Sequence, residues 1–478
     1  CDLQEEPYGF YSDDNFYKSE TDAESGLLYA YNALTFLEYS RGIFYIGDIP
    51  TETMSPKSDE AGDVYQLENW IANRETEQLQ YYFKYCYIAI NRANTVIDHI
   101  QNSSVLSETA RRRILGEAYF LRAWNYFNLV RTFGIVPVQT KMVAKLSQTT
   151  PPMATGLDQL YDLILGDLTR ADNLLEVNKV FGRADKVAAQ SLMAKAYLTI
   201  ASSKEHNVHR YTEMRREPQI MYDSAAYWAG KVVRDYKNVY DFDTNLRDIY
   251  DVDKPTGPEH IFIMPIDRSG TQEGNYSKLP LLFLPSNNSV PFYIRYGNGD
   301  LQRANGNGWG VFLCNDEFVE TQFSTTDKRR TELIHRDIYD ASGNPIVPNQ
   351  VKGYFSSKYV DPDFIGERTS ARPYLIRFSD IALVYAEAAG PEAGLAYVNR
   401  IRERAGVTPL PSGMTTDKFR EAVIKERALE LAFEGNRLYD LRRTASVTTT
   451  DIKAAGLSEA EAAYYPIPQR EIDLNPNL

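Results

Sequence analysis

The chain has 478 residues, and its 52 basic and 65 acidic side chains give a formal net charge of −13. A hydrophobic fraction of 43%, with 12% aromatic residues, is sufficient for a folded core and excludes a globally disordered chain. The acidic excess disfavours a nucleic-acid-binding protein, because binding to phosphates requires clustered Lys and Arg side chains.

The chain begins with Cys1, whereas an unprocessed protein begins with Met. Bacterial lipoproteins are cleaved directly before a cysteine that then receives lipid, and several acyl chains on one residue give durable anchoring. We therefore expect Cys1 to be the lipidation site and residues 1–20 to form a tether. The alternative is a sequence that starts at a cysteine by chance. No apolar run approaches the roughly 18 residues that a membrane-spanning helix needs.

Helical periodicity dominates residues 75–240, where apolar side chains recur at spacings of three and four. Ser107 is a suitable N-cap for one of these helices, and Gly134 is a suitable stop. Small residues such as Ala188 and Ala194 favour helix pairs that stack like tetratricopeptide hairpins, so this region is the predicted scaffold. The predicted helices are Glu77–Ile100, Ser107–Phe133, Leu157–Leu175, Val187–Ile200 and Asp223–Tyr236.

Residues 251–315 differ, because Pro, Gly and Asn interrupt short runs that are typical of β-strands. A long irregular segment within a helical body is either disordered or functional, and the many aromatic residues here argue against disorder. We therefore predict a loop-rich insert that holds the candidate ligand site. The predicted strands are Ile261–Pro265, Leu281–Leu284, Phe292–Tyr296 and Val311–Leu313.

Helical periodicity returns in residues 316–463, and the Pro-rich residues 464–478 are predicted to form an extended strap. The whole chain, residues 1–478, is expected to be one mainly α body. In it, tetratricopeptide-like helical hairpins pack against a loop-rich irregular half with a few short strands. The predicted helices of this part are Asp316–Phe323, Ile381–Ala389, Glu392–Ala405 and Asp417–Leu441.

Common catalytic motifs are absent: the sequence has no G-x-S-x-G, no G-x-x-x-x-G-K-[ST] and no H-E-x-x-H. The pair His206 and His209 lies in a charged segment, which indicates a solvated loop rather than a zinc site. We therefore predict no catalytic residue, no metal and no cofactor. Cys86 and Cys314 could form a disulfide, although the apolar helical surroundings of Cys86 favour a buried free thiol.

Tyrosine is unusually frequent, with 34 residues against 21 phenylalanines. Aromatic ring faces can stack on the C–H faces of sugars, while Asn and Arg side chains bind sugar hydroxyls. The Gly- and Asn-rich stretch Tyr296–Gly310 and the segment Asp63–Asn73 combine these residue types. The alternative for each ring is packing in the core. We predict stacking by Trp70, Tyr296 and Trp309, and hydrogen bonding by Asn73, Asn298, Arg303 and Asn305.

Seven segments carry a further pattern, and the most specific is Lys425–Arg443, KERALELAFEGNRLYDLRR. The others are Ala89–Ile97, Gly116–Pro137, Gly182–Leu198, Tyr374–Ala388, Tyr397–Gly406 and Tyr465–Asn475. In the order in which they occur along the chain, these seven segments resemble the SusD-like (RagB/SusD) family of outer-membrane, nutrient-binding lipoproteins of the Bacteroidetes. The resemblance implies four tetratricopeptide-like hairpins that support a looser, loop-rich half.

The resemblance also implies a non-catalytic, cell-surface glycan-binding lipoprotein, anchored in the outer membrane through lipid on Cys1. Such a protein captures oligosaccharides and delivers them to a SusC-like TonB-dependent transporter, as the lid of its barrel. Oligopeptide capture by the same kind of lid is the main alternative, and a glycosidase or a ligand-free structural subunit are two others. The motifs themselves are expected to be scaffold, with ion pairs between helices formed by Arg122, Arg131, Glu426, Glu430, Arg437 and Asp440.

Overall fold

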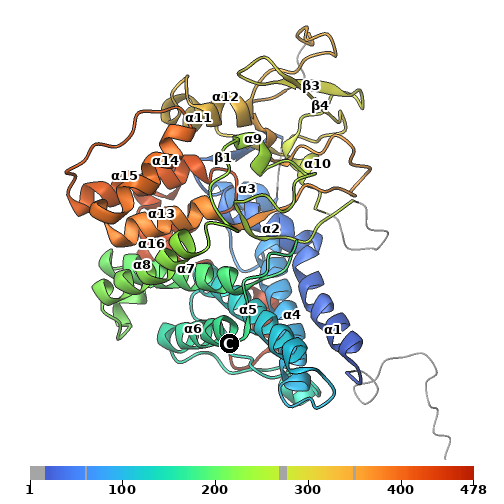
Figure 1. Cartoon of the computed structure of the whole chain (residues 1–478), viewed down its shortest axis with the longest axis vertical. Coiled ribbons are helices and arrows are strands. Elements are labelled where there is room, and N and C mark those ends of the chain that lie inside the picture. Colours follow the sequence, from blue (N-terminus) through green and yellow to red (C-terminus); the bar gives the residue numbers. More distant parts are fainter. Residues whose placement is uncertain (1–16, 60–61, 269–276, 348–350) are drawn as a thin grey trace, which may run out of the picture.

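Figure 1 shows the computed structural model of the chain, which describes residues 17–59, 62–268, 277–347 and 351–478. Long helices fill the lower and left parts of the view, and short strands with irregular connections lie at the upper right. The predicted mainly α fold is confirmed. Cys1, the predicted lipidation site, lies outside the described residues.

The predicted helical scaffold contains five long helices, and each packs against the next one along the chain. The stacking of successive helices is the arrangement predicted for the hairpins. Ser107 caps the second of them, because its side chain accepts a hydrogen bond from the Ala110 N–H at 3.3 Å, and Gly134 ends it at φ +76°. The five are α4 (Glu77–Ile100), α5 (Glu108–Phe133), α6 (Leu157–Leu174), α7 (Lys186–Glu205) and α8 (Pro218–Asp235).

The sequence did not predict three helices that precede this scaffold in the described residues: α1 (Glu20–Asn32), α2 (Leu37–Gly47) and α3 (Asp63–Glu68). The buried stripe of α1 is made largely of small residues, so its apolar signal is weak. Helix α1 packs on α4 and α5. Polar contacts secure it, since the Tyr31 hydroxyl donates to the buried Glu117 carboxylate at 2.6 Å.

The strands among the described residues form four two-stranded antiparallel sheets. The predicted strand Leu281–Leu284 is wrong: its first three residues belong to α10 (Leu279–Phe283), in which Pro280 occupies the first turn, and Leu284 is the C-cap of this helix. A short buried apolar run fits a strand and a helix equally well, and Pro suits the first turn of a helix. The pairs are β1 (Met54–Pro56) with β5 (Phe312–Cys314), β2 (His260–Ile263) with β8 (Tyr374–Arg377), β3 (Phe292–Arg295) with β4 (Leu301–Ala304), and β6 (Ile334–His335) with β7 (Phe355–Ser356).

Two predictions for the C-terminal part need correction. The expected helix Asp417–Leu441 is interrupted by a turn over residues 431–436, in which Phe433 and Gly435 have φ angles of +65° and +76°. The expected strap at residues 464–478 contains a short helix, α19. The helices here are α11 (Asp316–Gln322), α12 (Lys328–Leu333), α13 (Phe378–Ala389), α14 (Pro391–Arg404), α15 (Thr416–Glu430), α16 (Arg437–Arg443), α17 (Val447–Thr450), α18 (Glu459–Ala463) and α19 (Gln469–Leu474).

Cys86 and Cys314 are both buried and free, so they do not form a disulfide. Within the described ranges, no helix combines the length and the apolar character that crossing a bilayer requires.

A buried ion-pair network joins the C-terminal helices to the strands, with Arg377 at its centre. The Arg377 guanidinium is fully buried and lies 2.8 Å from carboxylate oxygens of Glu259, Glu430 and Glu434. Its Nη2 also donates to the Glu430 carbonyl oxygen at 2.6 Å. Arg404, on α14, pairs with Glu259 and Glu430 as well. The network therefore connects β8, α14, α15 and the 431–436 turn.

The predicted ion pairs between helices are confirmed for four of the six motif residues and differ for Arg131 and Arg437. The Arg131 guanidinium lies over the rings of Phe127 and Tyr439, with centroid distances of 4.1 and 3.9 Å. Arg437 pairs with Glu52, which lies in the turn between α2 and β1. The four confirmed pairs are Arg122–Asp167, Glu426–Arg329, Glu430–Arg404 and Asp440–Arg427.

Replacing Arg377 with leucine should reduce the free energy of unfolding by about 3–5 kcal/mol, because buried carboxylates lose their counter-charge. Urea unfolding followed by circular dichroism measures the loss. The matched control is Arg210→Ala, which removes a solvent-exposed pair with Glu213 and should cost no more than about 1 kcal/mol. Equal losses in the two variants would contradict a central role of Arg377.

The network should also make stability depend on pH in the acidic range. Burial would raise the pKa of Glu430, but the charges of Arg404, Arg377 and Arg329 outweigh it and lower this pKa from 4.5 to about 2. The stabilisation is therefore complete above about pH 4.5 and is lost as the pH falls towards 2.

The expected loss from Glu430 alone is on the order of 3 kcal/mol over this interval. Urea midpoints measured between pH 6 and pH 2.5 test it, and Glu430→Gln should show a shallower dependence than the unsubstituted protein. Identical slopes for the two proteins would be incompatible with the lowered pKa.

Candidate functional site

Trp70 lies in the turn after α3 and is 8% exposed. Its indole N–H donates to Asp451 Oδ2 at 3.3 Å, and its ring stacks on Tyr465 at a centroid distance of 6.2 Å. Contrary to the expectation for a stacking platform, Trp70 therefore offers no free ring face. Asn73 is exposed, and its side-chain oxygen accepts a hydrogen bond from the Glu75 N–H at 2.9 Å, which shapes the local turn.

Tyr296 is also buried, at 6% exposure, within a small core under the β3–β4 hairpin. The Arg247 guanidinium covers its ring at 4.5 Å from the centroid, and His335 packs against it edge-on at 5.5 Å. Its hydroxyl donates to Gln302 of β4. The structure thus uses Tyr296 to hold the hairpin, and the expected stacking face is occupied.

Trp309 is the predicted aromatic residue that remains accessible, with 48% exposure. The Lys278 ammonium group lies 5.6 Å from its ring centroid. Nearby polar candidates are engaged within the chain. Arg303 donates to Asp363 at 3.0 Å, Asn305 donates to the Phe364 carbonyl oxygen at 3.0 Å, and Asn298 donates to Asp300 at 2.6 Å.

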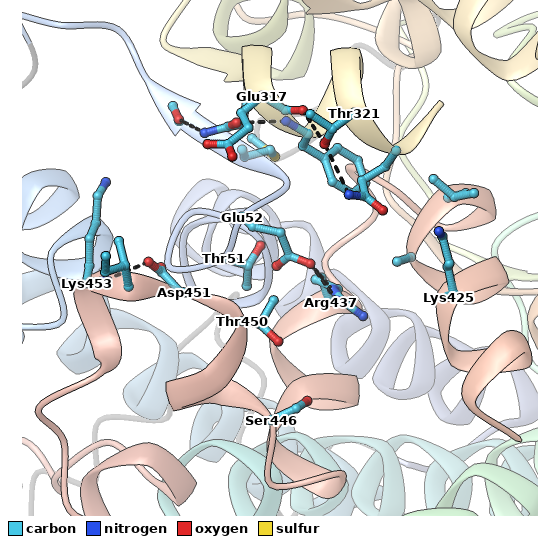
Figure 2. A pocket seen from close by; sticks show the side chains of 18 of the residues that line it. Thr51, Glu52, Glu317, Thr321, Lys425, Arg437, Ser446, Thr450, Asp451 and Lys453 are labelled. Atoms are coloured by element: carbon cyan, nitrogen blue, oxygen red, sulfur yellow. Dashed lines mark hydrogen bonds and ion pairs between the residues drawn. The ribbon is translucent and has the colours of Figure 1, made fainter. Parts of the chain in front are cut away.

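A cleft of about 710 Å³ lies elsewhere, where four segments distant in sequence meet. In Figure 2, Glu317 and Thr321 of α11 lie across this cleft from Ser446 and Thr450, and Lys425 of α15 lies at one side. The volume is typical of ligand sites in proteins. None of the seven predicted ligand contacts lines it. The segments that contribute are residues 49–55, 315–322, 421–437 and 446–453, together with Glu68.

An ion pair between Glu52 and Arg437 lies near the middle of the view in Figure 2. Arg437 Nε and Nη2 donate to the same oxygen, Glu52 Oε1, at 2.8 and 2.5 Å. In the described part of the chain, the other oxygen, Glu52 Oε2, and the third nitrogen, Arg437 Nη1, have no hydrogen-bond partner although both atoms are buried. Such atoms usually have a partner, so this ion pair retains hydrogen-bonding capacity at the wall of the cleft that no described residue uses.

Further polar side chains give the cleft both acceptors and donors. Lys453 pairs with Glu68 at 2.7 Å, and Asp451 accepts from the Trp70 indole. Glu317 and Lys425 are exposed on opposite elements. Carboxylates accept hydrogen bonds from hydroxyl groups, and ammonium and guanidinium groups donate hydrogen bonds to hydroxyl oxygens. The cleft can therefore bind a ligand that carries many hydroxyl groups.

The apolar side chains that line the cleft are Ile49, Met54, Phe318, Ile424, Ala428, Leu429 and Ile452. Phe318 is the aromatic residue among the described lining side chains, and its ring packs edge-on against Phe323 at 5.5 Å. It is 3% exposed, so it supplies an edge rather than an open face. Recognition in the cleft would depend on hydrogen bonds more than on ring stacking. The described residues include no group of three or more His, Cys, Asp and Glu side chains placed to hold a metal ion.

Sequence reasoning missed most of these cleft residues. Arg437 lies inside the most specific sequence segment and was assigned to the scaffold alone, yet its guanidinium reaches the cleft. Lys425 opens the same segment and was not singled out as a ligand contact, and Glu52 and Asp451 have no local pattern that separates them from other surface charges. Their only common property is that the fold brings them together.

Comparisons with known protein families match two separate parts of the chain. A family described as "Starch-binding associating with outer membrane" matches residues 18–198. The "SusD family" matches residues 333–478. These two ranges do not overlap and together include more than half of the sequence.

Individual relatives match over most of the chain. "SusD-like protein P2" of Formosa agariphila is 24% identical, over 92% of this chain and 87% of its own length. A "SusD-like protein" of Bacteroides ovatus is also 24% identical, over 92% of this chain and 78% of its own length.

Solved structures are similar in fold. A SusD homolog from Bacteroides thetaiotaomicron superposes with a TM-score of 0.78 at 20% identity, over 98% of this chain and 97% of that one. A structure described as "Laminarin binding SusD-like protein" gives a TM-score of 0.76 at 23% identity, over 96% of this chain and 98% of that one.

Proposed function

Because the chain belongs to the SusD-like family, we propose that it is a non-catalytic glycan-binding protein of the outer membrane. Its ligand is an oligosaccharide, and the cleft around Glu52 and Arg437 is the main binding site. Support comes from relatives whose names refer to starch and laminarin. The fold alone would not carry this proposal, since one fold can serve many functions.

The chemistry of the cleft is the observation that carries the proposal. Glu52 Oε2 and Arg437 Nη1 have no hydrogen-bond partner among the described residues, and sugar hydroxyls can donate to a carboxylate and accept from a guanidinium group. Thr321 and Thr450 add hydroxyl groups, and the half-buried Ile424 and the exposed Ile452 offer surface to the C–H faces of a ring. Several hydrogen bonds, less the cost of association, give micromolar to millimolar affinity.

The exposed ring of Trp309 is a second proposed contact, suited to a longer glycan that extends beyond the cleft. The loop that holds Trp309 comes just before β5, and β5 pairs with β1. Met54 and Ser55 of β1 line the cleft. The same two-stranded ribbon thus links the cleft and the Trp309 loop. Lipid on Cys1 and delivery to a SusC-like TonB-dependent transporter, as the lid of its barrel, complete the proposed role.

Isothermal titration calorimetry with maltoheptaose, laminarihexaose and a mixture of hexapeptides tests the proposal. We expect heat from at least one oligosaccharide, none from the peptides, and no new reducing ends after prolonged incubation. Binding of peptides alone would favour oligopeptide capture, and release of reducing ends would identify a glycosidase.

Lys425→Ala should weaken binding of the responsive oligosaccharide roughly tenfold or more, because a hydrogen bond to a charged group is lost. The control is Lys237→Ala, which removes an exposed lysine that does not line the cleft, and it should leave the affinity unchanged. If both variants bind like the unsubstituted protein, the ligand does not occupy the cleft beside α15.

Trp309→Ala should weaken binding about two- to tenfold, since a stacked ring contributes about 0.5–1.5 kcal/mol beyond area burial. Trp309→Phe keeps a ring and should retain most of the affinity. The comparison is made by calorimetry with the longest oligosaccharide that binds. Equal affinity of the alanine variant and the unsubstituted protein would remove Trp309 from the site.

A further inference from the structure

The turn over residues 431–436 is held in an unusual conformation beside the cleft. Phe433 adopts φ +65°, a left-handed conformation that costs a residue with a side chain roughly 1–2 kcal/mol. Hydrogen bonds from two neighbouring residues, Lys358 and Tyr359, stabilise this turn. The Lys358 ammonium group donates to the Ala432 carbonyl oxygen at 2.8 Å, and the Tyr359 hydroxyl donates to the Phe433 carbonyl oxygen at 2.8 Å.

Asp48, at the end of α2, forms a hydrogen bond with the other side of this turn. Its Oδ2 accepts a hydrogen bond from the Gly435 N–H at 2.6 Å. Gly47 lies directly against Gly435, so close that a β-carbon on Gly47 would meet the Gly435 carbonyl oxygen at 2.3 Å. Asp48 is fully buried and does not line the cleft.

The end of α2 and the 431–436 turn also lead directly to the two residues of the Glu52–Arg437 pair. Arg437 is the first residue of α16, directly after the turn. Glu52 follows Asp48 by four residues, and a tight turn links them, in which the Thr51 N–H and hydroxyl donate to the Asp48 carbonyl oxygen at 3.0 and 2.6 Å. The contact of Asp48 with Gly435 therefore sets the distance between the segments from which Glu52 and Arg437 reach each other.

We propose that Asp48 is a positioning residue for the cleft: by holding Gly435 it fixes the 431–436 turn and thereby places Arg437 against Glu52. Its effect on ligand affinity rests on the proposed function, whereas its effect on the turn does not. A buried residue outside the cleft then controls the geometry of a donor and an acceptor inside it.

The charged surroundings of Asp48 agree with a hydrogen-bonding role that does not need full ionisation. Burial raises the pKa of Asp48 to about 7, against the lowering effect of the Gly435 and Arg437 N–H groups; Glu434 raises it slightly and Lys358 lowers it. Tyr359, whose pKa burial raises, also faces this carboxyl group. Because the group titrates near neutral pH, the neutral amide of an asparagine is a close substitute, with one oxygen able to accept from Gly435.

Hydrogen–deuterium exchange of the peptide that spans residues 431–437 tests the proposal without any ligand. Asp48→Ala should speed exchange of the Gly435 amide about tenfold, because its acceptor is lost. Asp48→Asn should restore slow exchange. Residues 115–130 of α5 should exchange equally in all proteins, which separates local loosening from global destabilisation. Unchanged exchange in Asp48→Ala, or an asparagine variant as fast as the alanine variant, would overturn the proposal.

If Asp48→Ala does not fold, Tyr359→Phe provides a milder test, since it removes the hydrogen bond to Phe433 from the opposite side of the turn. It should speed exchange of the same peptide, and Asp48→Asn should still exchange slowly. Calorimetry with maltoheptaose and laminarihexaose tests the effect on ligand binding. Asp48→Ala or Tyr359→Phe should bind the responsive sugar at least threefold more weakly than the unsubstituted protein does. A loosened turn in a protein that binds neither sugar would retain the positioning role and reject the proposed function.

Discussion

The buried guanidinium of Arg377 is the interaction on which the C-terminal half of the molecule depends. A charge without solvent is tolerated only when opposite charges and hydrogen bonds surround it completely. Here basic and acidic side chains meet in equal number, so the cluster is neutral while its members come from many elements. They are Arg329, Lys358, Arg377, Arg402 and Arg404 with Glu259, Asp327, Glu426, Glu430 and Glu434.

This network explains how a scaffold motif and a binding cleft come to share one segment. Glu430 and Glu434 flank the point where α15 ends, and both are held by Arg377. The chain can then turn sharply through Phe433 and Gly435 and present Arg437 to the cleft. The motif is conspicuous in sequence because many of its side chains are buried charges, whereas its Lys425 and Arg437 line the proposed cleft.

The three candidate aromatic residues also divide between the packed scaffold and the exposed surface. Trp70 and Tyr296 have polar atoms that find partners within the chain, Asp451 and Gln302, so that the fold uses them as packed, hydrogen-bonded core residues. Trp309 is held by its backbone, and its ring stays in solvent. A tyrosine-rich composition is equally compatible with both outcomes, because the same amphipathic ring suits an interior and a sugar-binding surface.

The sequence by itself determined the helical scaffold and the family: periodicity located α4, α5 and α6 to within a residue and α7 and α8 to within five, and the spaced motifs identified most of the buried charges. It did not reveal the break at residues 431–436, because Lys425–Arg443 reads as continuous helix until the contacts of Lys358, Tyr359 and Asp48 stabilise left-handed residues. Nor could it reveal the cleft. Glu52, Glu317 and Lys425 are separated from one another by more than a hundred residues, and only tertiary packing decides which surface charges face one another.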